Sequence, residues 1–273
     1  MKSSTAGRLN LLANIGQLVE AGLSYVGDLA ILSGNAFRTL LASPLKRGRS
    51  VDRAIAQAME VGVRAIPIVS LITFFNGLIL ALQGAYELKK LGAMQLVPAL
   101  VAVSITRELG PLITAIVVIG RSGSAFAAEI GTMRVTEELD ALEAMALDPM
   151  AFLVAPKFIA MGLMVPCLAI WADLMGTLGG CAFGTIAGGF SIGGYFNGTL
   201  NALVAGDVVT GIFKAFVFGL IITAVGCHQG FATGAGAQEV GKATTSAVVQ
   251  SILMIILVDV VFTVFFYVTG GLH

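Results

Sequence analysis

Two adjacent ionisable residues, Arg107 and Glu108, lie inside an apolar stretch that extends from Leu96 to Gly120. An ionised side chain is costly in such surroundings, so it needs a charged partner or a polar cavity. On a helix, neighbouring side chains point about 100° apart, so the two residues cannot share one partner on their own helix. Because a guanidinium matches phosphate well, the pair predicts a polar patch that receives a charged lipid headgroup. The alternative is a structural pair bonded to neighbouring helices.

Other motifs for catalysis or nucleotide binding are weak. Residues 236–243 nearly fit a phosphate loop, but Ala243 replaces the Ser or Thr that holds magnesium, and no strand precedes it. The chain has two histidines, His228 and His273, which leaves little for histidine-based metal or triad chemistry. Residues 120–124 fall short of a serine-nucleophile motif, so we expect them to form the turn that ends the second span. The sequence therefore predicts no catalytic residue, no metal site and no cofactor in this chain.

A charged segment follows that apolar stretch, between Arg121 and Pro149. Thr136 suits the start of a short helix, and Asp148-Pro149 suits its end. Such a helix could lie on headgroups or dock on a partner protein, and its acidic character disfavours an anionic membrane surface. We therefore predict a short helix in this segment that docks on a partner protein.

The composition shows what must position these residues. Hydrophobic residues form 57% of the 273 positions and charged residues 12%, and the mean hydropathy is +0.92. Soluble domains normally carry about 25% charged residues, so most of this surface must face lipid. The formal net charge is zero, which excludes a basic field for nucleic acid.

Five apolar stretches reach the roughly 20 residues that a membrane-spanning helix needs. They cover residues 65–86, 96–120, 156–188, 208–228 and 245–269. The third is too long for one perpendicular span, so it predicts tilt, a break or protrusion into solvent. Lys214 lies near a span end, where we expect its ammonium to reach the interface.

Residues 9–41 carry one apolar stripe at helical spacing, which predicts an amphipathic helix in the interface plane; a soluble N-terminal cap is the alternative. Half of the sixteen Lys and Arg residues lie in residues 1–64, so the N-terminus is predicted to be cytoplasmic. Five crossings then place residues 121–155 and 229–244 on the same, cytoplasmic side. The chain divides into an N-terminal region, 1–64, and a five-span domain, 65–269.

Glycines recur every four residues along the third stretch, which predicts a smooth strip for close helix packing. They are Gly176, Gly180, Gly184 and Gly188. On the first stretch, helical spacing predicts a lipid-facing cavity wall formed by Phe75, Leu78, Leu82 and Tyr86.

Several of these motifs together resemble the signature of the MlaE/YrbE family of ABC-transporter permeases. They are Arg107-Glu108-Leu109-Gly110-Pro111, Gly120-Arg121-Ser122-Gly123-Ser124 with the charged segment that follows, and Ala243-Thr244-Thr245. The similarity extends from about residue 60 to 269. It implies a homodimer in the bacterial inner membrane that moves phospholipid. It also implies a cytoplasmic ATPase, an MCE-domain protein on the outer side, and a small accessory subunit as a further partner. The ATPase would bind a coupling helix at about 129–147. The implied contact residues are Glu129, Arg134, Glu137, Glu138, Leu139, Asp140, Leu142 and Glu143. ATP and magnesium would be held by the ATPase.

The sequence therefore predicts an all-α polytopic membrane protein with an interfacial N-terminal helix, five transmembrane helices and a cytoplasmic coupling helix. Two other functions stay open on the residues alone. An intramembrane lipid-modifying enzyme would explain the charges within spans, and a scaffold or channel subunit would explain the glycine strip.

Overall fold

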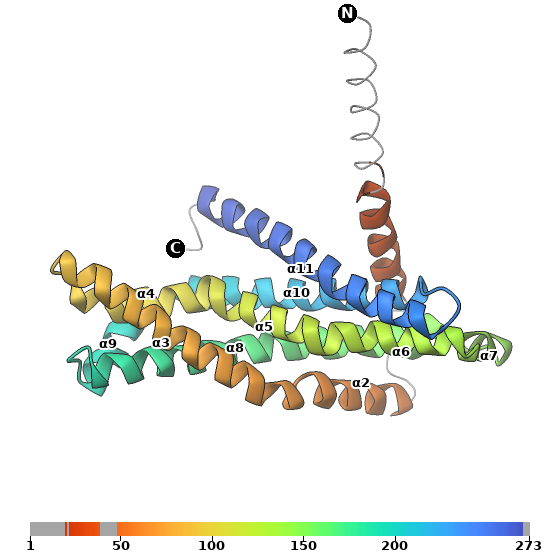
Figure 1. Ribbon diagram of the computed structural model, residues 1–273, viewed down its shortest axis with the longest axis horizontal. Helices are drawn as coiled ribbons and strands as arrows, with labels where there is room; N and C mark the ends of the chain where they lie inside the picture. Colours follow the sequence, from red (N-terminus) through yellow and green to blue (C-terminus); the bar gives the residue numbers. More distant parts are fainter. Residues whose placement is uncertain (1–19, 21, 39–47, 270–273) are drawn as a thin grey trace, which may run out of the picture.

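The computed structural model describes residues 20, 22–38 and 48–269, and every regular element in this part of the chain is a helix (Figure 1). Among these residues, five helical segments are long and apolar enough to cross a membrane. They are Asp52–Lys90, Met94–Val135, Met150–Ile186, Ala205–Phe231 and Ala237–Val268. The predicted all-helical architecture with five spans is thereby confirmed. Much of the predicted N-terminal helix lies outside the described residues, but residues 22–38 are helical.

The first span is built from two helices that meet at a short break. Helix α2 (Gly48–Val61) leads through η1 (Val63–Ala65) into α3 (Ile66–Lys90). Pro67 lies in the first turn of α3, where its missing N–H costs no hydrogen bond. Between Ala65 and Tyr86 the chain has no ionisable side chain apart from the tyrosine phenol, so α3 can lie in hydrocarbon.

The second span contains two wider π-turns. It passes from η2 (Met94–Leu96) and α4 (Val97–Ser104) through the π-turn η3 (Ile105–Leu109) into α5 (Gly110–Val118). The second π-turn, η4 (Ile119–Gly123), continues directly into α6 (Ser124–Val135). Pro111 cannot donate to the carbonyl of Arg107, so the wide turn before it accommodates the lost bond. The turn predicted at residues 120–124 was wrong, because the helix continues through them to Val135.

The third span contains a long unbroken helix, which excludes the predicted break and leaves tilt or protrusion to accommodate its length. After the short helix α7 (Glu138–Ala144) and the π-turn η5 (Met150–Val154), helix α8 covers Ala155–Ile186. Its 32 residues extend about 48 Å, well beyond a hydrocarbon layer of about 30 Å. Pro166 lies inside α8 and does not interrupt it.

The last three helices complete the bundle. The short helix α9 (Ile192–Ala202) begins at Ser191, whose hydroxyl accepts a hydrogen bond from the Gly194 amide. Helices α10 (Ala205–Phe231) and α11 (Ala237–Val268) form the fourth and fifth spans. Figure 1 shows α7 and α9 at opposite ends of the bundle, and α11 diverging from it toward its C-terminal end.

The tightest packing joins α3 to α8 through glycines. A Cβ atom on Gly77 would lie 1.9 Å from the Gly176 carbonyl oxygen, and one on Gly179 would lie 1.9 Å from the Phe74 carbonyl oxygen. Only glycine permits two backbones to approach so closely. Gly180 and Gly184 instead receive the ring of Tyr195 from α9, while Gly188 lies beyond the end of α8. The glycine contacts of α8 therefore lie within this chain.

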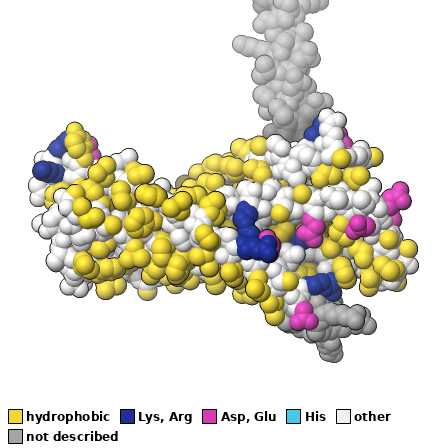
Figure 2. Space-filling model, turned by 60° about the horizontal axis from the view of Figure 1, so that its bottom comes forward, with side chains coloured by type: hydrophobic (Ala, Val, Ile, Leu, Met, Phe, Trp, Pro, Cys, Tyr) yellow, Lys and Arg dark blue, Asp and Glu magenta, His cyan; other side chains and the backbone are white. Residues whose placement is uncertain are grey.

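Apolar and charged side chains occupy different parts of the surface along the bundle. Figure 2 shows hydrophobic side chains crowded over the left half of the visible face, with charged side chains at its far tip. Basic and acidic side chains are scattered over the right half. An apolar surface of this kind suits contact with lipid.

Candidate functional site

The π-turn η3 places Arg107 and Glu108 toward different partners. The Arg107 Nε atom lies 3.3 Å from a carboxylate oxygen of Asp207 in the first turn of α10. The other Asp207 oxygen accepts a hydrogen bond from the Val204 amide, which fixes the carboxylate in place. Glu108 turns instead to Lys214, so the two adjacent residues bond to separate groups on α10, as their angular spacing predicts.

Lys214 is the centre of a buried charge network. Its side chain is 2% exposed, and its Nζ atom lies 2.5 Å from Glu108 and 3.0 Å from Asp259 on α11. The Thr263 hydroxyl also joins the network, since it lies 2.6 Å from Glu108 and 3.1 Å from the Lys214 Nζ. The prediction that Lys214 reaches the membrane interface was wrong, because two carboxylates compensate its charge within the bundle. The sequence signal for this ion pair was a basic residue, Lys214, in one apolar stretch and an acidic residue, Glu108, in another.

A small cavity of about 270 Å³ opens beside this network. Arg107, Glu108 and Lys214 line it together with Ser104, Thr210 and aromatic Phe266 and Tyr267. The Arg107 side chain is 43% exposed, and its ion pair with Asp207 engages only Nε. The remaining N–H groups can therefore bind an anionic group that enters the cavity, while the aromatic rings can contact an acyl chain.

The predicted apolar wall on α3 lies elsewhere. Phe75, Leu82 and Tyr86 are exposed and Leu78 is half-buried. Leu82 and Tyr86 line a second cavity of about 680 Å³ at the end of α3, while Phe75 and Leu78 do not. Within one chain, the wall and the Arg107 patch thus do not share a cavity.

The segment predicted as one coupling helix is divided in two. Helix α6 ends at Val135, and Glu137 adopts a left-handed backbone with φ of 61° before α7 begins. Thr136 does not start the second helix, because its hydroxyl bonds to the Thr132 carbonyl one turn earlier. The left-handed residue turns the chain sharply and sets α7 across the end of the bundle.

Leu139 and Leu142, the apolar stripe of α7, face the interior of this chain. Both are buried in a cluster that includes Leu29 from the N-terminal helix, Ile130 and Phe158. They therefore hold α7 in place, and Glu137, Glu138, Asp140 and Glu143 form its exposed surface. A partner that docks on α7 would meet carboxylates first.

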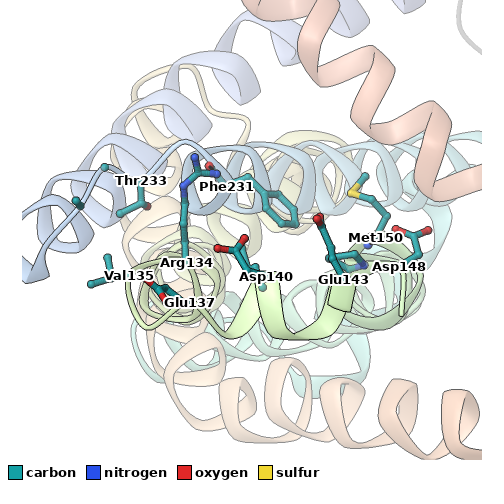
Figure 3. A pocket seen from close by; sticks show the side chains of 13 residues that line it. Arg134, Val135, Glu137, Asp140, Glu143, Asp148, Met150, Phe231 and Thr233 are labelled. Atoms are coloured by element: carbon teal, nitrogen blue, oxygen red, sulfur yellow. Dashed lines mark hydrogen bonds between the residues drawn. The ribbon is translucent and has the colours of Figure 1, made fainter. Parts of the chain in front are cut away.

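Three of these carboxylates, those of Glu137, Asp140 and Glu143, line a cavity of about 640 Å³ at the end of the bundle, which we call the acidic cup (Figure 3). Its lining includes Arg134, Glu137, Asp140, Glu143 and Asp148, together with the loop after Phe231. The Arg134 guanidinium donates a hydrogen bond of 2.5 Å to the Phe231 carbonyl oxygen. This contact joins the end of α6 to the end of α10, within two segments that were predicted to lie on the same side of the membrane.

Glu129 lies apart from the acidic cup and bonds to α8. Its carboxylate is 2.6 Å from the Nζ atom of Lys157, whose side chain is 1% exposed. The same ammonium lies 4.7 Å from the centre of the Phe126 ring. The pair therefore ties α6 to the start of α8, a role that the sequence did not indicate for either residue.

Neither a phosphate loop nor a metal centre is found in the described part of the chain. Residues 237–243, from the near match to a phosphate loop, form the first turns of α11, and Lys242 pairs with Glu239 on the same helix. Among the described residues, no three His, Cys, Asp or Glu side chains gather as metal ligands would.

Comparison with known proteins places this geometry in context. A family model described as permease MlaE matches residues 54–265. A probable ABC transporter permease protein of Rickettsia felis is 37% identical over 259 residues, which cover 95% of this chain and 98% of that protein. The intermembrane phospholipid transport system permease protein MlaE of Haemophilus influenzae is 33% identical over 235 residues, 86% of this chain and 90% of that protein. The chloroplastic protein TRIGALACTOSYLDIACYLGLYCEROL 1 of Arabidopsis thaliana is 36% identical over 217 residues, 80% of this chain and 62% of that protein.

Proposed function

This chain belongs to the MlaE family of permeases, membrane subunits that act with ATPase partners in ABC transporters, and we propose that its cargo is phospholipid. The lipid would pass between a bacterial inner membrane and an MCE-domain protein on the outer side. Membership in a permease family sets aside the lipid-modifying enzyme and the scaffold as alternatives.

The observation that carries this proposal is the half-exposed Arg107 beside an intramembrane cavity. One guanidinium edge is fixed by Asp207, and aromatic rings lie across the same cavity. This combination suits a ligand with an anionic headgroup and an apolar tail. The name of the Haemophilus influenzae relative, which specifies intermembrane phospholipid transport, supports the same cargo.

ATP and magnesium would be bound by the partner ATPase, and the acidic cup would receive that partner. The exposed carboxylates of α7 provide the contact, while Leu139 and Leu142 transmit its movement into the bundle. The permease would exchange between two conformations that differ in the position of α7. A ligand or partner shifts such a conformational equilibrium only by the difference between its affinities for the two conformations. Nucleotide-driven movement of α7 would therefore change the affinity of the cavity for lipid.

A homodimer would complete the transport path. One face of α11 carries exposed apolar side chains, among them Leu253, Leu257 and Val261, and α3 exposes Phe75 and Leu82. Two such faces can enclose a shared space that a single chain leaves open. Residues Phe75, Leu78, Leu82 and Tyr86 would then contact acyl chains from each side.

The test is ATP-dependent transfer of fluorescent phospholipid from liposomes that contain the permease–ATPase complex to the MCE-domain partner. Arg107→Gln should lower both the phospholipid retained by the complex and the transfer rate, because the phosphate loses its charged donor. Recovery of the ATPase should stay unchanged. Undiminished transfer by the variant would refute the role of Arg107, and absence of any phospholipid transfer by the native complex would refute the cargo.

A further inference from the structure

A second cluster of basic side chains lies within the first span, at the break between α2 and α3. Arg64 forms an ion pair with Glu60 one helical turn before it. Arg121 from η4 donates to the other Glu60 carboxylate oxygen at 3.1 Å and to the Glu60 backbone carbonyl at 2.7 Å. Two guanidinium groups therefore share one carboxylate, which leaves the cluster with a net positive charge.

The length of α3 places this cluster at the membrane surface. Helix α3 has 25 residues, which rise about 37 Å and slightly exceed the hydrocarbon layer of about 30 Å. Arg64 precedes this helix, while Lys89 and Lys90 form its other end. Because Arg121 contacts Glu60 directly, it lies at the same depth, on the side of the bundle that carries the acidic cup.

The side chains around the cluster are apolar and exposed. Ile55, Met59, Val63 and Ile68 are 54%, 59%, 51% and 46% exposed. Arg64 is 70% exposed, and within the described part of the chain Glu60 is its only ion-pair partner. The guanidinium groups favour a polar environment, whereas the exposed apolar side chains around them favour hydrocarbon. They match the boundary between phosphate headgroups and acyl chains.

We propose that Arg64 and Arg121 bind the phosphate of an anionic phospholipid in the leaflet that faces the ATPase. Arg121, whose contacts fix it to the end of α2, provides a positioned charge, and Arg64 closes on the headgroup from the lipid side. Glu60 competes with the phosphate for both guanidinium groups. The apolar side chains of α2 and α3 contact the acyl chains.

This site is distinct from the Arg107 cavity. Arg107 and Arg121 are separated by 14 positions of nearly continuous helix, which correspond to about 21 Å along the span. The inference deepens the proposed function, because it places a docking point for lipid in the leaflet from which the transporter would load or into which it would release. It can be tested by lipid binding to the resting complex, without any transport step.

The experiment measures phosphatidylglycerol and phosphatidylcholine retained by the full permease–ATPase complex from nanodiscs that contain equal amounts of both lipids. Arg64→Gln should lower the retained ratio of phosphatidylglycerol to phosphatidylcholine about fivefold. Glu60→Gln should raise the ratio, because it removes the competing negative charge while its amide oxygen can still accept from Arg121. Lys242→Gln is the matched control, since Lys242 is, like Arg64, an exposed basic residue that is paired with a glutamate about one turn earlier in the chain.

An unchanged ratio of phosphatidylglycerol to phosphatidylcholine in Arg64→Gln, or a lowered ratio in Glu60→Gln, would overturn the proposal. The cluster would then have only a structural role, in which it connects α2 to the second span. Glycerophosphate added at millimolar concentration distinguishes a soluble phosphate ligand from a lipid. Displacement of the lipid by this headgroup alone would also overturn the proposal. Transport by the Arg107→Gln variant is a separate measurement, so failure of either hypothesis can be recognised independently.

Discussion

The ammonium group of Lys214 lies 2.5 Å from the carboxylate of Glu108, a residue 106 positions earlier in the chain. This contact joins the second span to the fourth, and Asp259 extends it to the fifth at 3.0 Å. A buried ion pair stabilises a fold weakly as a whole, but removal of one partner leaves an uncompensated charge. The network therefore constrains how three spans can pack.

Lys214→Met should destabilise the protein by about 3–5 kcal/mol, because Glu108 and Asp259 then lose their shared cation. Thermal unfolding of the detergent-solubilised protein, followed by fluorescence-detected size-exclusion chromatography, measures the loss. The exchange of both residues in Glu108→Lys with Lys214→Glu should recover part of it. Equal stability of the native protein and Lys214→Met would contradict the assigned network.

Lys157→Met should cost much less, about 1 kcal/mol or below, even though Lys157 is as deeply buried as Lys214. Its partner Glu129 is 44% exposed, so water can solvate the carboxylate when the lysine is removed. The same unfolding assay compares the two methionine variants. A larger loss in Lys157→Met than in Lys214→Met would reverse the expected order.

Gly77→Ala should destabilise the bundle by about 1–3 kcal/mol, because the new methyl group would meet the Gly176 backbone. Gly241→Ala is the matched control, since nothing lies within 4 Å of the added methyl group on that helical glycine. We expect it to be neutral or to stabilise by about 0.5–1 kcal/mol. Similar unfolding temperatures for the two variants would argue against close packing of α3 and α8.

Reversal of charge on α7, in Glu137→Lys with Glu138→Lys, should reduce co-purification of the ATPase. Both carboxylates are exposed, and Glu137 lines the acidic cup, so the change should act on the interface and leave folding intact. Glu87→Lys provides a control, because it reverses an exposed charge at the opposite end of the molecule. Unchanged ATPase recovery with the α7 variant would count against docking there.

Tyr195→Phe should preserve or raise stability, because the buried phenol oxygen of Tyr195 has no hydrogen-bond partner among the described residues. Desolvation by burial raises the pKa of the Tyr195 phenol. Above pH of about 10 the unfolded chain therefore loses this proton before the folded protein does, and native stability falls as pH rises. Urea unfolding of native protein and Tyr195→Phe at pH 8 and 10.5 should show a smaller alkaline loss in the variant.

The number of spans could be predicted from the sequence because long apolar stretches leave few alternatives in a membrane. The partners of Arg107 and Glu108 could not, since they depend on which helices become neighbours in space. The prediction for Lys214 was wrong for the same reason. Its position near the end of a span suggested that its ammonium reaches the membrane interface, whereas its partners come from other helices. Residues 120–124 were misjudged because glycine and serine are compatible with a π-turn as well as with a loop.

The roles on α7 show a further limit. The acidic segment was recognisable from its charge, but Leu139 and Leu142 were read as a surface for a partner. Their burial depends on the N-terminal helix and on Phe158, which come from distant parts of the chain. An apolar stripe alone does not reveal whether its own chain or another one covers it.

The glycine contacts between α3 and α8 also limit which helices can move relative to one another. Two backbones in direct contact cannot slide or separate without losing that fit, so these spans act as a stationary frame. Helix α11 diverges from the bundle and is held toward its C-terminal end by Asp259, Thr263 and the ring of Phe262, which meets the Phe213 ring edge to face. Motion during a working cycle would therefore arise outside this pair of helices, and the Lys214 network would make the fifth span move together with the second and fourth spans.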